Sequence, residues 1–206
     1  MDQERPLCCG RTFLAAGLLD EAKAEARRLL TVLAPYFERD IPLIGLEPSC
    51  LLTLRDEYAA LLPDEIIDSM ADHALLLEEF LVRNSNRLHL DLRPIAVKNA
   101  ALHGHCHQKA LTGTGPALEA IRRGGGCSKD LDSGCCGMAG SFGYEPEHLG
   151  VSLAIGERVL APAVREHRGP VVAPGFSCRH QVEHLTGVRA LSTAEWLADR
   201  LDDQGR

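Results

Sequence analysis

The residues of this chain best suited to chemistry are its cysteines, eight among 206 residues. Seven of them fall into two similar sets, in which Cys-Cys-Gly is followed by a distant Ser-Cys. The first cysteine set is Cys8, Cys9 and Cys50, and the second cysteine set is Cys106, Cys135, Cys136 and Cys178. From Cys9 to Cys50 is 41 positions, and from Cys136 to Cys178 is 42. Matched spacing in two sets is far more specific than one cysteine pair, so it predicts an internal repeat.

Thiolates suit soft metals and iron–sulfur clusters, which take about four of them from surrounding loops. The second set supplies four, and part of it lies in a glycine-rich stretch, 133–140. We expect Gly137 and Gly140 to let the chain wrap around a cofactor, with backbone N–H groups offsetting the negative charge. Cys127 has no counterpart in the first half and is interpreted as a small buried hydrophobic residue.

Histidines surround one of these cysteines, since His103, His105 and His107 alternate around Cys106. In an extended segment they point away from the face of Cys106. We expect His105 and His107 to contact a cofactor without ligating it, through hydrogen bonds or protonation. Metal ligation by any of the three histidines, His103 included, is the alternative. Glu47 occupies a ligand position of the repeat, but a carboxylate is a hard ligand, so we expect it to cap a helix or form an ion pair.

The elements that must position these residues alternate between helices and strands. Helices are expected at 18–33, from Cys50 to 61, and at 64–83, 115–123, 148–167 and 193–201; strands are expected at 41–47, 100–106 and 188–191 and before Cys178. A polar connection at 84–94 separates two tandem units, which we place at 1–95 and 96–206. This order favours an α/β fold with short, largely parallel strands and flanking helices.

Composition excludes several classes of protein. The formal net charge is −7 and Lys and Arg are not clustered, which argues against nucleic acid as a partner. No apolar run approaches the roughly 18–20 residues that a transmembrane helix needs. Because no secretion signal is recognisable, we expect a cytoplasmic protein, with contact to the inner face of the membrane through a partner as the alternative. In that compartment, cysteines point to metal or redox use rather than to disulfides.

Several strings of the sequence carry a family resemblance: Leu7-Cys-Cys-Gly-Arg-Thr12, Gly45-Leu-Glu-Pro-Ser-Cys50, His103-Gly-His-Cys-His-Gln-Lys-Ala110, Cys135-Cys-Gly-Met-Ala-Gly-Ser-Phe-Gly-Tyr144 and Ser177-Cys-Arg-His-Gln181. They resemble the cysteine-rich CCG domain family, which includes a subunit of heterodisulfide reductase. More closely, they are similar to the C-terminal region of fused FAD-linked oxidases and iron–sulfur D-2-hydroxy-acid dehydrogenases. The resemblance implies an iron–sulfur electron-transfer module with one [4Fe–4S] cluster on the second cysteine set. FAD would lie on a partner domain or subunit, and the substrate would be of the lactate, glycolate or 2-hydroxyglutarate class, with the electron acceptor left open.

The chain departs from the family pattern in two ways. The pattern places one further cysteine upstream of each Cys-Cys-Gly, and for Cys8 that position would precede Met1, so we expect a first unit that is truncated at its N-terminus. The family's CxxC keeps only its second cysteine, with Glu47 and Gly175 in place of the first. The sequence therefore leaves open whether the first cysteine set binds a second cluster.

Two hypotheses compete with electron transfer. One is a structural zinc protein without a redox role, in which the second cysteine set forms a closed tetrahedral site. The other is an enzyme that uses the vicinal cysteines as a redox or nucleophilic centre, which requires a perturbed thiolate in an accessible cleft.

Overall fold

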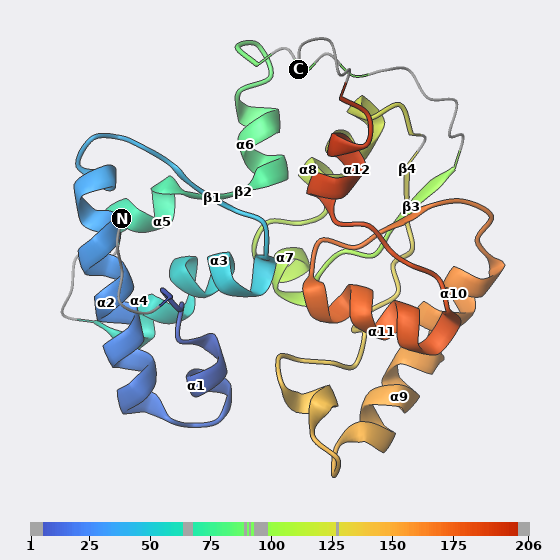
Figure 1. Ribbon diagram of the computed structural model, residues 1–206, viewed down its shortest axis with the longest axis horizontal. Helices are drawn as coiled ribbons and strands as arrows, with labels where there is room; N and C mark the ends of the chain where they lie inside the picture. The colour runs from blue at the N-terminus through green and yellow to red at the C-terminus, as the bar shows by residue number, and fades with distance from the viewer. Residues whose placement is uncertain are drawn as a thin grey trace.

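The computed structural model describes residues 6–63, 68–88, 90, 92, 99–126 and 128–201. The first half holds α1 (Arg11–Ala15), α2 (Leu19–Phe37), β1 (Leu43–Gly45), α3 (Pro48–Arg55), α4 (Glu57–Leu61), α5 (Asp68–His73), β2 (Ala74–Leu76) and α6 (Leu77–Arg83). The second half holds β3 (Ala100–Leu102), α7 (Cys106–Leu111), α8 (Gly115–Arg123), β4 (Ser128–Asp130), η1 (Phe142–Tyr144), α9 (Leu149–Arg158), α10 (Leu160–Glu166), β5 (Val171–Val172), α11 (Phe176–Thr186) and α12 (Thr193–Ala198). Figure 1 shows α1 to α5 on one side and α7 to α11 on the other, with α3 and α7 meeting between them.

The strands of the described residues form two small sheets, and every strand pair in these sheets is parallel, which fits the largely parallel strands expected from the sequence. β1 pairs with β2, and β3 lies between β4 and β5. β2, β3 and β5 are buried along their whole length, which suits their uniformly apolar side chains, Ala, Leu and Val, in parallel strands. β1, β3 and β5 are each followed by a helix that carries a cysteine, namely α3, α7 and α11. The α/β class is therefore confirmed, and cysteines gather beyond the carboxyl ends of strands, where such folds build sites.

Several expected boundaries are wrong. A single helix over 64–83 is interrupted by β2, because a short apolar run such as Ala74-Leu75-Leu76 fits a buried strand as well as a helix. The helix expected over 148–167 divides at Val159, whose φ of −140° is not helical. The expected strand at 188–191 is reduced to one bridge between Leu191 and Val172. The unit boundary at 95/96 and Cys127 lie outside the described residues. Among the described helices, none has the length and apolar character to cross a bilayer.

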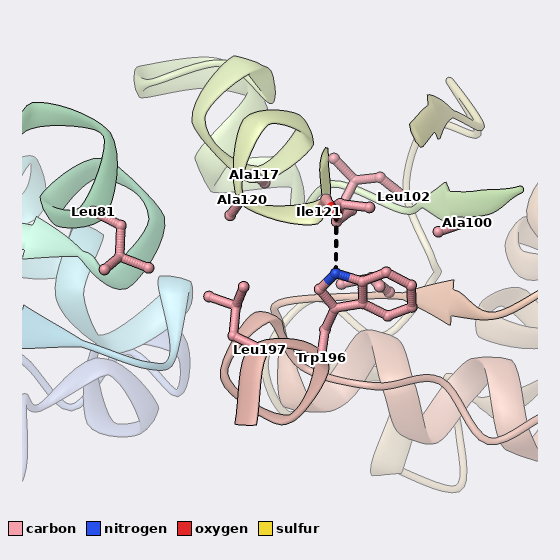
Figure 2. Packing of buried hydrophobic residues seen from close by; sticks show 9 residues of the cluster. Leu81, Ala100, Leu102, Ala117, Ala120, Ile121, Trp196 and Leu197 are labelled. Atoms are coloured by element: carbon pink, nitrogen blue, oxygen red, sulfur yellow. Dashed lines mark hydrogen bonds between the residues drawn. The ribbon is translucent and has the colours of Figure 1, made fainter. Parts of the chain in front are cut away.

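The largest buried side chain, Trp196, belongs to a hydrophobic cluster with residues from both halves of the chain. It is fully buried, and its Nε1 donates a hydrogen bond to the carbonyl of Ile121 at 3.2 Å. Figure 2 shows this bond, with Leu81 of α6 and Leu197 of α12 contributing to the same cluster as Leu102 of β3. Residues on both sides of the predicted unit boundary thus share one hydrophobic core.

A buried acid joins the halves near the cysteines. Glu78 is 3% exposed and accepts a hydrogen bond from Nε2 of Gln108 at 2.7 Å. Burial raises the pKa of Glu78, so the stability that the neutral acid contributes is complete at low pH and is lost as the pH rises through the folded-state pKa.

We therefore expect Glu78→Gln to stabilise the fold at pH 8 by roughly 1–2 kcal/mol, because the amide keeps a polar partner for Gln108 without a buried charge. The gain should shrink towards pH 5, as measured by urea unfolding at both pH values. The exposed Glu166→Gln is the matched control and should change little. A Glu78→Gln variant less stable than the wild type at pH 8 would contradict this account.

Candidate metal centre

The four thiols of the second cysteine set come together from three separate segments. Cys106 is the first residue of α7, Cys135 and Cys136 lie in the loop before η1, and Cys178 is the third residue of α11. Each thiol interacts electrostatically with the next, Cys106 with Cys135, Cys135 with Cys136 and Cys136 with Cys178. The structure thus brings the four predicted ligands to one region, in which Sγ of Cys136 and Sγ of Cys178 lie within 4.8 Å of each other.

Hydrogen bonding within this cluster favours thiolates. Cys136 and Cys178 are only 2% and 1% exposed. The pKa of Cys178 lies well below its usual range, mainly because the thiol of Cys136 hydrogen-bonds to it. The pKa of Cys135 is lowered to about 2 by hydrogen bonds from Cys106 and Cys136. The pKa values of Cys106 and Cys136 are correspondingly raised, because they supply the shared protons. A bound cation would relieve the repulsion that several thiolates in a buried place otherwise suffer.

The backbone of the glycine-rich loop is shaped around these sulfurs. Gly137 has φ of +96°, and a Cβ there would lie 2.2 Å from the carbonyl oxygen of Ser152. Its N–H donates to Sγ of Cys135 at 3.3 Å. Gly140 also has a positive φ, +72°, but a side chain there would meet open space. Gly137 is therefore required by packing and conformation, and Gly140 by conformation alone.

The three neighbouring histidines have different surroundings. His103 is fully buried, and a ring nitrogen lies within 4.8 Å of Sγ of both Cys136 and Cys178. The alternation argument concerned the face of Cys106 alone and did not predict this approach to Cys136 and Cys178. Burial lowers the pKa of His105. His107 places Nε2 3.3 Å from a carboxylate oxygen of Asp56 in the first half.

The first cysteine set is smaller and more open. Cys9 and Cys50 share a hydrogen bond, which lowers the pKa of Cys9 to about 6. All three thiols line an apolar cavity of about 510 Å³. Gly10 repeats the geometry of Gly137, with φ of +79° and its N–H donating to Sγ of Cys8 at 3.4 Å. Among the described residues, no strand pairs with the second edge of β1, whereas in the other half β3 pairs with β5 and leads to Cys106.

Glu47 lies between the two cysteine sets and caps two helices. Its Oε1 accepts hydrogen bonds from the backbone N–H and hydroxyl of Ser49 at 3.3 and 2.7 Å. Its Oε2 accepts from the backbone N–H of Phe176 at 2.7 Å. The expected cap of the following helix is confirmed, and the same carboxylate also caps α11, which carries Cys178.

Removing this carboxylate should loosen both helix starts. We expect Glu47→Ala to cost roughly 1–3 kcal/mol of unfolding free energy, since each lost cap is worth about 1 kcal/mol. Urea unfolding of the chain under reducing conditions measures the effect. The exposed Glu38→Ala is the control and should stay within about 0.5 kcal/mol of the wild type. Equal stability of the two variants would refute the double cap.

Comparison with known proteins places the chain among dehydrogenase relatives. No protein-family model matches it. It is 30% identical over 199 residues to a subunit of the anaerobic glycerol-3-phosphate dehydrogenase of Escherichia coli (strain K12), an alignment that covers 94% of this chain and 49% of the relative. It is 31% identical over 184 residues to D-2-hydroxyglutarate dehydrogenase of Pantoea ananatis, with 86% and 17% covered, and 32% identical over 188 residues to that of Escherichia coli (strain K12), with 87% and 18% covered. The chain thus spans about half the length of the first relative and less than a fifth of the other two.

Proposed function

We propose that this chain is the iron–sulfur electron-transfer part of a FAD-linked dehydrogenase and holds one [4Fe–4S] cluster on the second cysteine set. The observation that carries the proposal is the convergence of four thiols from three segments on one place, where Cys136 and Cys178 are buried and Cys106 and Cys135 are half-buried. The similarity to dehydrogenases and to one subunit of a dehydrogenase supports an oxidoreductase role.

The residues present fit such a cofactor. Four thiolates are the donors that iron–sulfur clusters take, and a bound cluster supplies one-electron transfer. Cys106, Cys135, Cys136 and Cys178 would hold it. The N–H of Gly137 already points at Sγ of Cys135, and hydrogen bonds to sulfur tune the reduction potential. Cys178 lies in the first turn of α11, where the helix dipole favours a thiolate.

We further propose that the chain consists of two CCG-type units, 1–95 and 96–206. Three pairs of features support this division. β1 and β5 each precede a helix whose third residue is a cysteine. Gly10 and Gly137 share their backbone geometry. In α6 and α12, Glu79 and Glu195 each accept a hydrogen bond from the N-cap backbone N–H, at 2.9 and 2.8 Å. The first set offers three thiols among the described residues, so we assign the cluster to the second.

The wider assignment concerns the whole assembly. We propose that FAD lies on a partner domain or subunit, and that electrons from a D-2-hydroxy acid pass from the flavin through this chain to an acceptor. The two D-2-hydroxyglutarate dehydrogenases support this substrate class. We place the assembly in the cytoplasm, with any contact to the inner face of the membrane made through the partner.

Zinc is the second candidate, because His103, Cys136 and Cys178 offer donor atoms that zinc also takes. The two are separated by purifying the full chain without oxygen and measuring iron, acid-labile sulfide and zinc per chain. We expect about four iron and four sulfide per chain. Stoichiometric zinc without labile sulfide would refute the electron-transfer proposal in favour of a structural site.

A further inference from the structure

One ring nitrogen of His103, Nδ1, is hydrogen-bonded to a side chain, and the other, Nε2, has no nitrogen or oxygen partner. Its side chain is fully buried at the carboxyl end of β3. Nδ1 shares a 2.6 Å hydrogen bond with the hydroxyl of Ser133, which is itself 4% exposed. Nε2 is buried and has no nitrogen or oxygen partner among the described residues, while the ring interacts with the thiol of Cys178. An unpaired buried polar atom costs roughly 1–3 kcal/mol, so its position calls for an explanation.

The ring of His103 has sulfur neighbours. His103 offers a ring nitrogen within 4.8 Å of Sγ of Cys136 and of Cys178. Because Ser133 engages Nδ1, the lone pair of Nε2 is the one free to bind. Histidines that bind metals show this arrangement, in which a hydrogen bond at the second nitrogen fixes the tautomer and the ring orientation.

The neighbouring ligand position of the repeat cannot supply a further thiolate. Gly175 stands there, and a Cβ added to it would lie 2.6 Å from the ring of His105 and 3.3 Å from Sγ of Cys178. The ring of His105 therefore fills the space of a side chain at Gly175. A donor beyond the four cysteines must therefore come from another element. His103, which directly follows β3, is such a residue.

We infer that Nε2 of His103 is a ligand of the metal centre formed by the second cysteine set and binds beside Cys136 and Cys178. This inference rests on the proposed function for the nature of the centre, but it concerns the ligand itself. The imidazole binds as a neutral group: Nε2 donates its lone pair, and Nδ1 keeps the proton and donates it in a hydrogen bond to Ser133. Because the imidazole is neutral, it adds a donor to the thiolate set without adding negative charge.

Pulsed electron paramagnetic resonance of the reduced, anaerobically purified full chain tests the ligand directly. We expect a strong nitrogen coupling that changes when the protein is labelled with ¹⁵N-histidine. The coupling should be absent from His103→Gln and retained in His105→Gln, the matched control from the same loop. The labelled wild type answers the question by itself if His103→Gln fails to fold.

The outcomes separate the inference from the proposed function. An iron–sulfur spectrum without histidine nitrogen coupling overturns the ligand and leaves electron transfer standing. If the chain binds zinc, X-ray absorption at the zinc edge should show a nitrogen that His103→Gln removes, which would support the ligand and refute electron transfer. A chain that holds neither metal would overturn both.

Discussion

Replacing Cys178 by Ser should remove the cofactor from the second cysteine set. Cys178 is 1% exposed, sits in the first turn of α11 and hydrogen-bonds to Cys136, so a serine oxygen would put a hard donor at the most buried point of a soft site. We expect iron and labile sulfide per chain to fall to less than about a tenth of the wild-type values, because cluster affinity depends on a complete ligand set. Metal analysis after anaerobic purification measures the loss.

The first cysteine set provides the matched control for this variant. Cys50 occupies the same position in α3 as Cys178 does in α11, the third residue of the helix, but it is exposed. Cys50→Ser should leave iron and sulfide on the second set unchanged. Equal losses in the two variants would show that the cofactor is shared between the sets, and retention of iron by Cys178→Ser would remove Cys178 from the ligands.

A single methyl group at Gly137 should be enough to disrupt the glycine-rich loop. The added Cβ would lie 2.2 Å from the carbonyl oxygen of Ser152, which is backbone of α9 and cannot rotate away. The residue would also keep φ near +96°, which is strained for alanine. Overpacking and backbone strain each cost about 1–3 kcal/mol, so we expect Gly137→Ala to lose roughly 3–5 kcal/mol of stability. Urea unfolding of the chain under reducing conditions measures this cost.

Gly140→Ala is the control within the same loop. Its φ of +72° also disfavours alanine, but a Cβ would meet open space. We expect a cost of only about 1–2 kcal/mol, from conformation alone. Similar costs for Gly137→Ala and Gly140→Ala would mean that the loop relaxes away from Ser152 and that close packing at Gly137 is not what fixes its shape.

Local signals in the sequence predicted the fold where they were unambiguous. The helix expected at 115–123 matches α8, because Pro116 suits a first helical turn and Gly124 ends the pattern. β2 was not predicted, because an apolar run of three residues is too short to show either the helical or the strand periodicity. β4 was missed because Ser128-Lys129-Asp130 lacks the apolar residues typical of strands and is specified by its pairing with β3.

The sequence predicted the cysteines of the candidate site, but it predicted fewer of the contacts that surround them. Matched spacing singled out Cys135, Cys136 and Cys178 without any knowledge of contacts, and Cys106 was added as a fourth thiol; metal binding by this set stays a prediction. The approach of His103 to Cys136 and Cys178 was not predicted, because alternation along one segment cannot indicate sulfurs from other segments. The second helix cap of Glu47 joins residues 129 positions apart, which no local pattern reveals. For His103, the signal that could have indicated its role is a histidine at the carboxyl end of a parallel strand, next to a cysteine-bearing helix.

Reversible reduction of the bound cofactor tests the central claim most directly. The anaerobically purified chain is titrated with dithionite and then reoxidised while its visible absorption is recorded. We expect a broad absorption that bleaches on reduction, returns on reoxidation and is absent from Cys178→Ser but present in Cys50→Ser. A colourless chain, or an absorption that does not respond to dithionite, would contradict the assignment of this protein as an electron carrier.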